Sequence, residues 1–424
     1  MSRASRIATL AVLVAAPVAG LPAAGCGGNK SNGYAPDAGG NSLTSCGHAD
    51  CDGDGYATPA DCDDTNPQIN PEAFDFPGDG IDNDCDGTVD DPVLTCETVP
   101  GQPPGTPTDF ARAADLCAQH AITNAGTVFD PLVHASWGQV SGLGPGQTLW
   151  TSVTKPQQVA IASGFGQNQP RQGRTMAGLA NGPWAATDPR SSPALDPAGF
   201  HIDDACSDIP LVGQDCATLT AGTPAGAVSV QDWAELALTV RIPSNVQTAV
   251  FDFAFFSSEF NQWWSSAAND GFFVLVTSQG FQGQNVAKDE TGLGVTINSG
   301  FFQLCPAPPG PPGLTADKSA ALATCVGTTG DPSQSIFGVL TGTGYDGAAV
   351  SADDTAVAVN GNTYVYGGGS GWLTAKFPVV PRETIVMRVI VADTFDGLKD
   401  SAVLFDALRW EPTSETGVGR PTNQ

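Results

Sequence analysis

The residues with the clearest chemical potential are aspartates that recur at every second position near the N-terminus. Asp50, Asp52 and Asp54 are followed by Gly55, and Asp61 is the twelfth residue counted from Asp50. Carboxylates at positions 1, 3, 5 and 12 around a glycine-centred turn are typical calcium ligands, because the turn directs them to one point. Without a cation, carboxylates this close would repel one another. The spacing therefore predicts a cation site.

Two further groups complete the predicted oxygen shell of this loop, namely the carbonyl of Tyr56 and a water held by Thr58. A looser copy of the pattern follows in DNDCDGTVDD, with Gly87 at its sixth position. Its twelfth position is Val93, so this second loop must close differently. The ligands predicted for it are Asp82, Asp84, Asp86, Thr88 and Asp90. The alternative interpretation of both copies is an acidic, solvated linker.

A larger pattern surrounds the two loops. The run CDGDGYATPADCDDTNPQINPEAFDFPGDGIDNDCDGTVDD resembles the MopE-type metal-binding motif, with its DGDGY, DCDD, NP.INP and GDGIDNDCDG elements. Prolines interrupt the region throughout, which indicates bare loops rather than helix-flanked EF-hands. One member lends that family an association with copper, but copper favours thioether or imidazole ligands. Residues 46–92, the acidic module, contain no Met and only His48, so we expect one or two calcium ions.

The N-terminus predicts export and lipid anchoring. Residues 1–25 combine a basic start with an apolar run and end before Cys26, which is typical of a bacterial lipoprotein signal with Cys26 as the acylated residue. Cleavage nearby by ordinary signal peptidase is the alternative, and prolines and a glycine in the apolar run argue against a transmembrane helix. Residues 26–45 are predicted to be a flexible tether. We therefore expect a protein held by its lipid at the bacterial cell envelope, at the outer membrane or cell surface.

The cysteines fit an oxidising compartment. There are eleven, and setting Cys26 aside leaves ten, which can pair completely. A zinc site is the competing use of cysteine, but no CxxC pair exists. Proximity in the chain predicts pairing among Cys46, Cys51, Cys62 and Cys85 and the pairs Cys96 with Cys117, Cys206 with Cys216, and Cys305 with Cys325.

Composition limits both the partners and the fold. The 424 residues include 17 basic and 44 acidic ones, and the net charge of -27 argues against nucleic acid and against anionic membrane surfaces as partners. With 51 glycines and 33 prolines, the chain suits a turn-rich, mainly β secreted protein. We expect the small calcium-loop module to be followed by a large antiparallel β-sandwich with one short helix.

The remaining boundaries follow from local patterns. A Pro-rich linker is predicted at 93–108, a helix in 109–122 with Thr108 or Asp109 as its cap, the sandwich over 109–412, and a tail at 413–424.

Two segments of the predicted sandwich resemble the choice-of-anchor L domain. They are VFDFAFFSSEFNQWWSSAANDGFFVLV and WLTAKFPVVPRETIVMRVIVADTFDGLKDSAVLFDALRW. Phe260 and Ser258 depart from its pattern. The resemblance implies an exported surface protein without specifying a ligand.

Acidic residues in these segments suggest a further site. If their strands are neighbours, Glu259, Asp270, Asp393 and Asp400 could meet at one edge and bind a second calcium, or an acid pair could hydrolyse glycosides. The favoured alternative is that they are turn caps and loop acids. The adjacent Trp263 and Trp264 could stack on a sugar ring or line an interface.

No pattern indicates an enzyme. The four histidines form no HExxH, no GxSxG precedes a triad, and no cysteine stands in a catalytic signature. We expect no enzymatic activity. The first hypothesis is a structural or adhesive surface protein that binds another surface protein or a glycan. A carbohydrate-binding surface protein is the second hypothesis, and a secreted hydrolase is the third.

Overall fold

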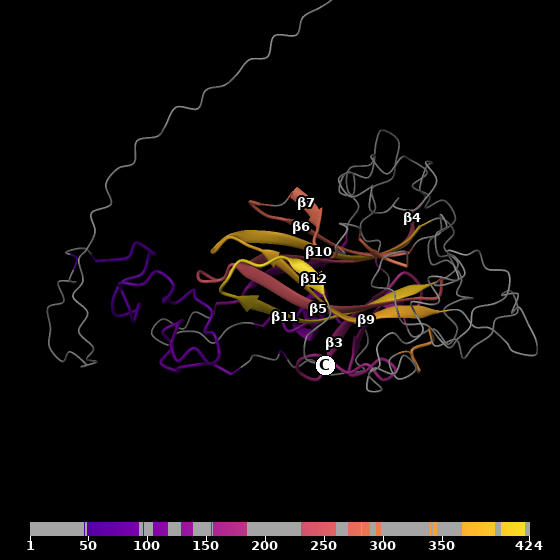
Figure 1. Cartoon of the computed structure of the whole chain (residues 1–424), viewed down its shortest axis with the longest axis horizontal. Coiled ribbons are helices and arrows are strands. Elements are labelled where there is room, and N and C mark those ends of the chain that lie inside the picture. The colour runs from indigo at the N-terminus through magenta and orange to yellow at the C-terminus, as the bar shows by residue number, and fades with distance from the viewer. Residues whose placement is uncertain are drawn as a thin grey trace, which may run out of the picture.

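The structure is a computed structural model of the whole chain. It describes residues 46, 49–92, 96, 105–117, 129–138, 154, 156–184, 230–259, 270–280, 282–288, 294–297, 340, 342–345, 367–394 and 400–419. The predicted signal peptide and tether, Cys26, Trp263, Trp264 and the pairs Cys206–Cys216 and Cys305–Cys325 lie outside these residues. Two antiparallel sheets stack as layers, so the predicted mainly β sandwich is confirmed (Figure 1).

The centre of the first sheet is formed by β4, β10 and β6, in which β10 pairs with two strands that lie far from it in the sequence. Its order is β1-β4-β10-β6-β7, and β8 also pairs with β6. Every pairing in it is antiparallel. The strands span Leu132–Trp137 (β1), Val230–Arg241 (β4), Thr384–Thr394 (β10), Gly271–Thr277 (β6), Gln282–Asn285 (β7) and Val295–Thr296 (β8).

The second sheet has the order β12-β9-β5-β11-β3-β2, again entirely antiparallel. A 3-10 turn, η1 (Pro156–Gln158), leads into β2. The strands span Gly417–Gly419 (β12), Gly368–Pro378 (β9), Thr248–Ser257 (β5), Ser401–Glu411 (β11), Met176–Ala180 (β3) and Val159–Ala162 (β2).

Strand β5 is buried on both faces, which explains why most of its residues are apolar. Phe251, Phe253 and Phe255 alternate into the core between the sheets and are fully buried. Phe256 points to the other face, where it packs against Phe165 with ring centroids 5.3 Å apart. Because an outer layer covers this face as well, the strand reads as a continuous apolar run rather than an alternating one.

The single helix among the described residues begins earlier and is shorter than the sequence predicts. Helix α1 spans Pro107–Ala113, not a segment starting at residue 109. Its N-cap is Thr106, whose amide and hydroxyl both donate to Asp109 Oδ2, at 2.7 and 3.0 Å. The predicted caps were wrong because Pro107 fits the first helical position and Asp109 is the third helical residue of a capping box. No helix in the described part of the chain is long and apolar enough to cross a membrane.

The described residues of the acidic module form no helix or strand, and the module lies at one end of the sandwich (Figure 1). Disulfides join Cys46 to Cys51 and Cys62 to Cys85, so the four cysteines pair within the module as predicted, and the structure supplies the connectivity that the sequence left open. A third disulfide, also predicted, joins Cys96 to Cys117 just after α1. Because the module contains few large apolar side chains, these covalent links supply order that a core would otherwise supply.

Candidate metal centre

The first aspartate loop is held by hydrogen bonds from its own backbone to its own carboxylates. Asp50 Oδ2 accepts from the amide of Gly55 at 3.0 Å. Asp52 Oδ1 accepts from the amide of Asp54 at 3.1 Å, and Asp54 Oδ1 accepts from the amide of Tyr56 at 2.8 Å. Asp52 and Asp54 thus each use Oδ1 to fix the loop and keep a buried Oδ2 without a hydrogen bond. Asp50 fixes the loop through both oxygens, because its Oδ1 also accepts from the amide of Gly53 at 2.6 Å.

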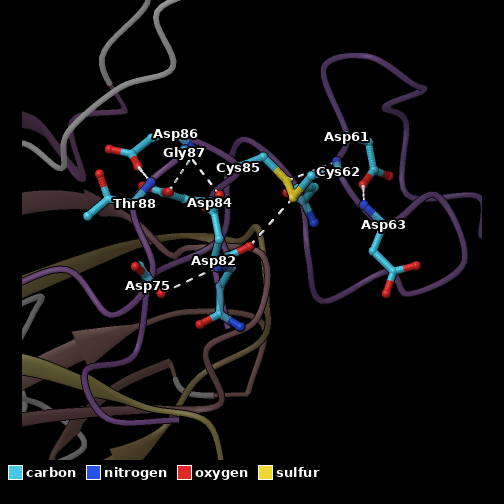
Figure 2. Close-up of a disulfide and its surroundings, with 12 residues drawn as sticks. Asp61, Cys62, Asp63, Asp75, Asp82, Asp84, Cys85, Asp86, Gly87 and Thr88 are labelled. Atoms are coloured by element: carbon cyan, nitrogen blue, oxygen red, sulfur yellow. Dashed lines mark hydrogen bonds between the residues drawn. A yellow bond between two sulfur atoms is a disulfide. The ribbon is translucent and has the colours of Figure 1, made fainter. Parts of the chain in front are cut away.

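The second aspartate loop repeats this arrangement position by position. Asp82 Oδ2 accepts from the amide of Gly87 at 3.1 Å. Asp84 Oδ1 accepts from Asp86 at 3.2 Å, and Asp86 Oδ1 accepts from Thr88 at 2.6 Å (Figure 2). The three hydrogen bonds connect positions 1 to 6, 3 to 5 and 5 to 7 in both loops. The two copies are therefore one folded motif used twice, not a solvated linker.

Glycine at the sixth position makes this turn accessible. Gly55 has φ +99° and Gly87 has φ +97°, a left-handed conformation that other residues rarely adopt. As a result, three carboxylates in each loop bring oxygens within 4.8 Å of one another. Like charges at such distances need a cation between them or must take up protons.

Asp61, the predicted twelfth-position ligand, lies at the first loop. Its side chain is buried, with 1% of the residue exposed. Burial raises the pKa of Asp61 to about 6, and the charges of Asp54 and Asp52 add to this effect while the amide of Asp63 opposes it. Oδ2 atoms of Asp52, Asp54 and Asp61 are buried and accept no hydrogen bond. Buried oxygens without donors fit a hard cation such as calcium.

The structure gives Tyr56 a second role besides its predicted carbonyl. Burial raises the pKa of its hydroxyl to about 12, helped by a hydrogen bond with Glu72. The guanidinium of Arg382 lies over its ring, 5.9 Å from the centroid. Tyr56 therefore helps to join the loop to the sandwich, whereas Thr58 is exposed.

Acids other than Asp82, Asp84 and Asp86 hold the chain around the second loop. Asp90 Oδ1 accepts from the amides of Gly78 and Gly80, at 2.8 Å each, and so holds a neighbouring turn. Asp75 Oδ2 accepts from the amide of Asp91 at 2.8 Å. Burial raises the pKa of Asp84 to about 7, and the charges of Asp86, Asp91 and Asp75 contribute. Asp75 and Asp91 thus supply negative charge beside Asp84.

One disulfide ties the two loops together. Cys62 directly follows Asp61, and Cys85 lies between Asp84 and Asp86 (Figure 2). The amide of Cys62 also lies 3.0 Å from the Cys85 sulfur. The bond therefore fixes the closing residue of the first loop against the turn of the second.

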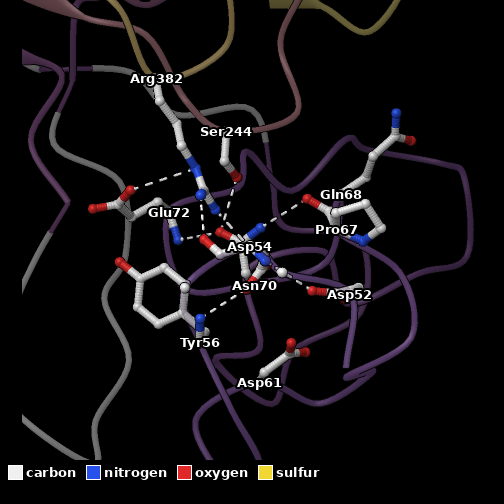
Figure 3. A network of polar contacts seen from close by, with 12 residues as sticks. Asp52, Asp54, Tyr56, Asp61, Pro67, Gln68, Asn70, Glu72, Ser244 and Arg382 are labelled. Carbon is white, nitrogen blue, oxygen red and sulfur yellow. Dashed lines mark hydrogen bonds and ion pairs between the residues drawn. The ribbon is translucent and has the colours of Figure 1, made fainter. Parts of the chain in front are cut away.

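Ion pairs and hydrogen bonds dock the module on the sandwich. Arg382, in the turn between β9 and β10, donates to the backbone oxygen of Asp54 and lies 3.8 Å from Glu72 (Figure 3). Arg241, the last residue of β4, also pairs with Glu72, at 2.5 Å. Asp54 thus belongs both to the loop and to the docking contact.

The turn between β4 and β5 contributes a second set of docking contacts. Phe74 donates its amide to Asn245 Oδ1, and its carbonyl accepts from Asn245 Nδ2, both at 2.8 Å. Ser244 Oγ donates to Asn70 Oδ1 at 2.8 Å. Phe74 and Phe76 also pack against the main core. The docking interface therefore combines apolar contacts with paired hydrogen bonds.

A further acidic group lies inside the sandwich. Glu259, Asp270 and Asp393 bring carboxylate oxygens within 4.8 Å of one another. They are 0%, 0% and 1% exposed. Asp270 Oδ2 accepts from Asn181 at 2.8 Å and from Ser401 at 2.6 Å. The ends of β5, β6 and β10 thus bring together three of the four acids that were considered as one site.

Asp400, the fourth acid, is not part of that group of three. Its backbone oxygen accepts from the amide and hydroxyl of Ser258, at 3.1 and 2.9 Å. Its carboxyl group lies so close to Gly182 that a side chain at that position would collide with it. Metal binding by the buried group stays a prediction.

Fold and site together define a mainly β protein that carries an acidic module with the features of a metal-binding motif. The sequence model of the family described as "Putative metal-binding motif" (Cu-binding MopE) matches residues 61–91. That range includes the closing residue of the first loop and most of the second. The chain has no match among curated proteins or solved structures.

Proposed function

We propose that this chain is an exported bacterial surface protein, anchored by a lipid on Cys26, whose acidic module binds one or two calcium ions. The module presents the β-sandwich for a structural or adhesive role. The observation that carries the calcium proposal is the matched hydrogen-bond pattern of the two loops, which leaves Oδ2 of Asp52 and Asp54 and Oδ1 of Asp82 buried without a hydrogen bond.

Charge and donor chemistry support calcium over copper. The module offers carboxylate and carbonyl oxygens, which hard cations prefer, and copper prefers imidazole or thioether groups. The expected affinity is that of extracellular calcium modules, roughly 0.1 to 1 mM or tighter. The anchoring and adhesive parts of the proposal rest on the N-terminal pattern and on the resemblance to the choice-of-anchor L domain.

Isothermal titration of the full chain tests the calcium proposal. Calcium should bind, and Asp50→Ala with Asp54→Ala should abolish one site while Asp82→Ala with Asp86→Ala abolishes the other. Asp79→Ala, an exposed acid of the same module outside both loops, is the matched control. Retention of copper with no uptake of calcium at millimolar concentration would contradict the proposal.

A further inference from the structure

Asp64 lies against the first loop although it stands outside the twelve-residue numbering. Its Oδ1 accepts a hydrogen bond of 2.9 Å from the amide of Cys51. Cys51 lies between Asp50 and Asp52, so this bond fixes the Asp64 carboxyl group beside the first two aspartates of the loop. This hydrogen bond satisfies Oδ1 of Asp64 but not Oδ2.

The second oxygen is buried without a hydrogen-bond donor. Asp64 is 9% exposed, and its Oδ2 accepts no hydrogen bond. Leaving a buried charged oxygen without a donor costs on the order of 1–3 kcal/mol or more. A cation bound at this oxygen would offset that cost.

The carboxylates next to Asp64 also have a buried oxygen that accepts no hydrogen bond. The Oδ2 atoms of Asp52 and Asp61 are also buried without hydrogen bonds. Asp64 is close enough for its charge to act on both of these residues. Arg382 reaches Asp54 at 3.7 Å and is the one cation paired with a loop aspartate among the described residues. Burial and charge thus both favour a cation among these oxygens.

We propose that Asp64 is a ligand of the cation in the first loop and that it closes this site together with Asp61. The inference rests on the proposed function, because it adds a ligand to a loop already proposed to bind calcium. Five carboxylates, from Asp50, Asp52, Asp54, Asp61 and Asp64, then surround one hard divalent cation. Calcium accepts six to eight oxygens in flexible geometry, so it tolerates this crowded set better than magnesium does.

The test removes the Asp64 charge while keeping its structural hydrogen bond. Asp64→Asn retains an oxygen that can accept from Cys51 and loses only the negative charge. Asp63→Asn is the matched control, because Asp63 is the adjacent residue, is exposed, and binds Thr65 at 2.7 Å. Both are made in an Asp82→Asn, Asp86→Asn background, so that the second loop does not contribute to calcium titration of the full chain and the differences between variants report the first loop.

The background protein should bind one calcium, and Asp64→Asn should weaken it by at least about tenfold, the size of effect that outer-shell partners of metals already produce. Asp63→Asn should titrate like the background. Calcium-free thermal melting of Asp64→Asn should match or exceed the background, because the variant loses one repelling charge. A lower melting temperature would instead assign Asp64 a structural role and overturn the inference.

Two further results would overturn the assignment of Asp64 as a ligand, and they differ in what they imply for the proposed function. If Asp64→Asn binds calcium as tightly as Asp63→Asn, Asp64 is not a ligand and the proposed function stands. If the background itself takes up no calcium at millimolar concentration, the first loop is not a calcium site, and the proposed function fails there with the inference.

Discussion

Arg382 and Asp54 are 328 positions apart in the chain and meet where the acidic module docks on the sandwich. Arg382 donates to the backbone oxygen of Asp54, and its Nη2 lies 3.7 Å from Asp54 Oδ2. The same aspartate holds the first loop through its other oxygen. The loop that is proposed to bind calcium is thus directly attached to the turn between β9 and β10.

Removing this contact should weaken docking. Arg382→Gln loses a charge-assisted hydrogen bond and two ion pairs, so we expect the free energy of unfolding to fall by roughly 1–3 kcal/mol in urea titrations. Lys376→Gln is the control, because its partners Glu411 and Glu415 belong to the sandwich and not to the module. Equal losses for the two variants would show that Arg382 has no special part in docking.

Calcium removal should loosen the module and leave the sandwich intact. Without a cation, the close carboxylates of each loop repel one another, whereas the sandwich keeps its apolar core. Limited proteolysis after chelation should cut first within residues 46–92, and mass spectrometry identifies the sites. Cleavage that begins within the sheets would contradict this prediction.

Opening the disulfide between the loops should weaken both cation sites. Cys62→Ala with Cys85→Ala removes a link across 23 positions, which is worth about 3 kcal/mol in the chain-entropy account. Calcium titration should then show lower affinity at both loops. The control is Cys46→Ala with Cys51→Ala, a link across 5 positions that joins no second loop. Unchanged affinity in the first variant would show that the loops fold separately.

The structural features that could be predicted from the sequence are those formed by residues close together in the chain. The DxDxDG spacing predicted both loops, because their hydrogen bonds join residues at most five positions apart. Neighbouring cysteines predicted the Cys96–Cys117 disulfide and the pairing of four cysteines within the module, but not which of those four are partners. The β-sandwich followed from short apolar runs separated by Gly and Pro. Each of these signals depends on residues close together in the chain.

The features that the sequence did not predict depend on residues that are far apart in the chain or that lie outside the calcium-loop pattern. Asp64 and Asp75 lie outside the two loops, and Asp91 lies at none of the predicted ligand positions, although their presence in a dense run of acids was a signal. Nothing near Asp54 in the chain points to Arg382, so the docking of the module could not be predicted. The helix start was misplaced because the capping box at Thr106 lies inside the segment read as a linker.

Asp406 should make the sandwich less stable as pH rises. Burial raises its pKa to about 8, and Asp115 adds to this, although the amide of Arg171 donates to it at 2.6 Å. It also faces Asp252 across the sheet, which pairs with Arg171 and Arg409. Between pH values near the ordinary 3.8 and about 8, the folded chain holds a proton that the unfolded chain has lost. The free energy of unfolding therefore declines through this window.

Asp406→Asn should remove that contribution to the decline, because the amide keeps an acceptor oxygen and cannot ionise. Urea unfolding at several pH values from 5 to 8.5, with calcium saturating, measures the slope for both proteins. Parallel slopes for the native protein and the variant would contradict the assignment to Asp406.

The proposed lipid anchor depends on one atom, the sulfur of Cys26. Replacing Cys26 with Ser should release the protein from the membrane fraction, because a serine hydroxyl does not accept the lipid. Fractionation and intact-mass measurement of the released protein check this. A Cys26→Ser protein that still partitions with membranes would count against acylation at this position.

The most direct measurement of the central claim is a crystal structure of the full chain grown with calcium. The account predicts one cation in each loop, bound by Asp50, Asp52, Asp54, Asp61 and Asp64 in the first and by Asp82, Asp84 and Asp86 in the second, at oxygen distances of about 2.3–2.6 Å. Ordered loops that hold only water at saturating calcium, with their carboxylates turned outward, would contradict it.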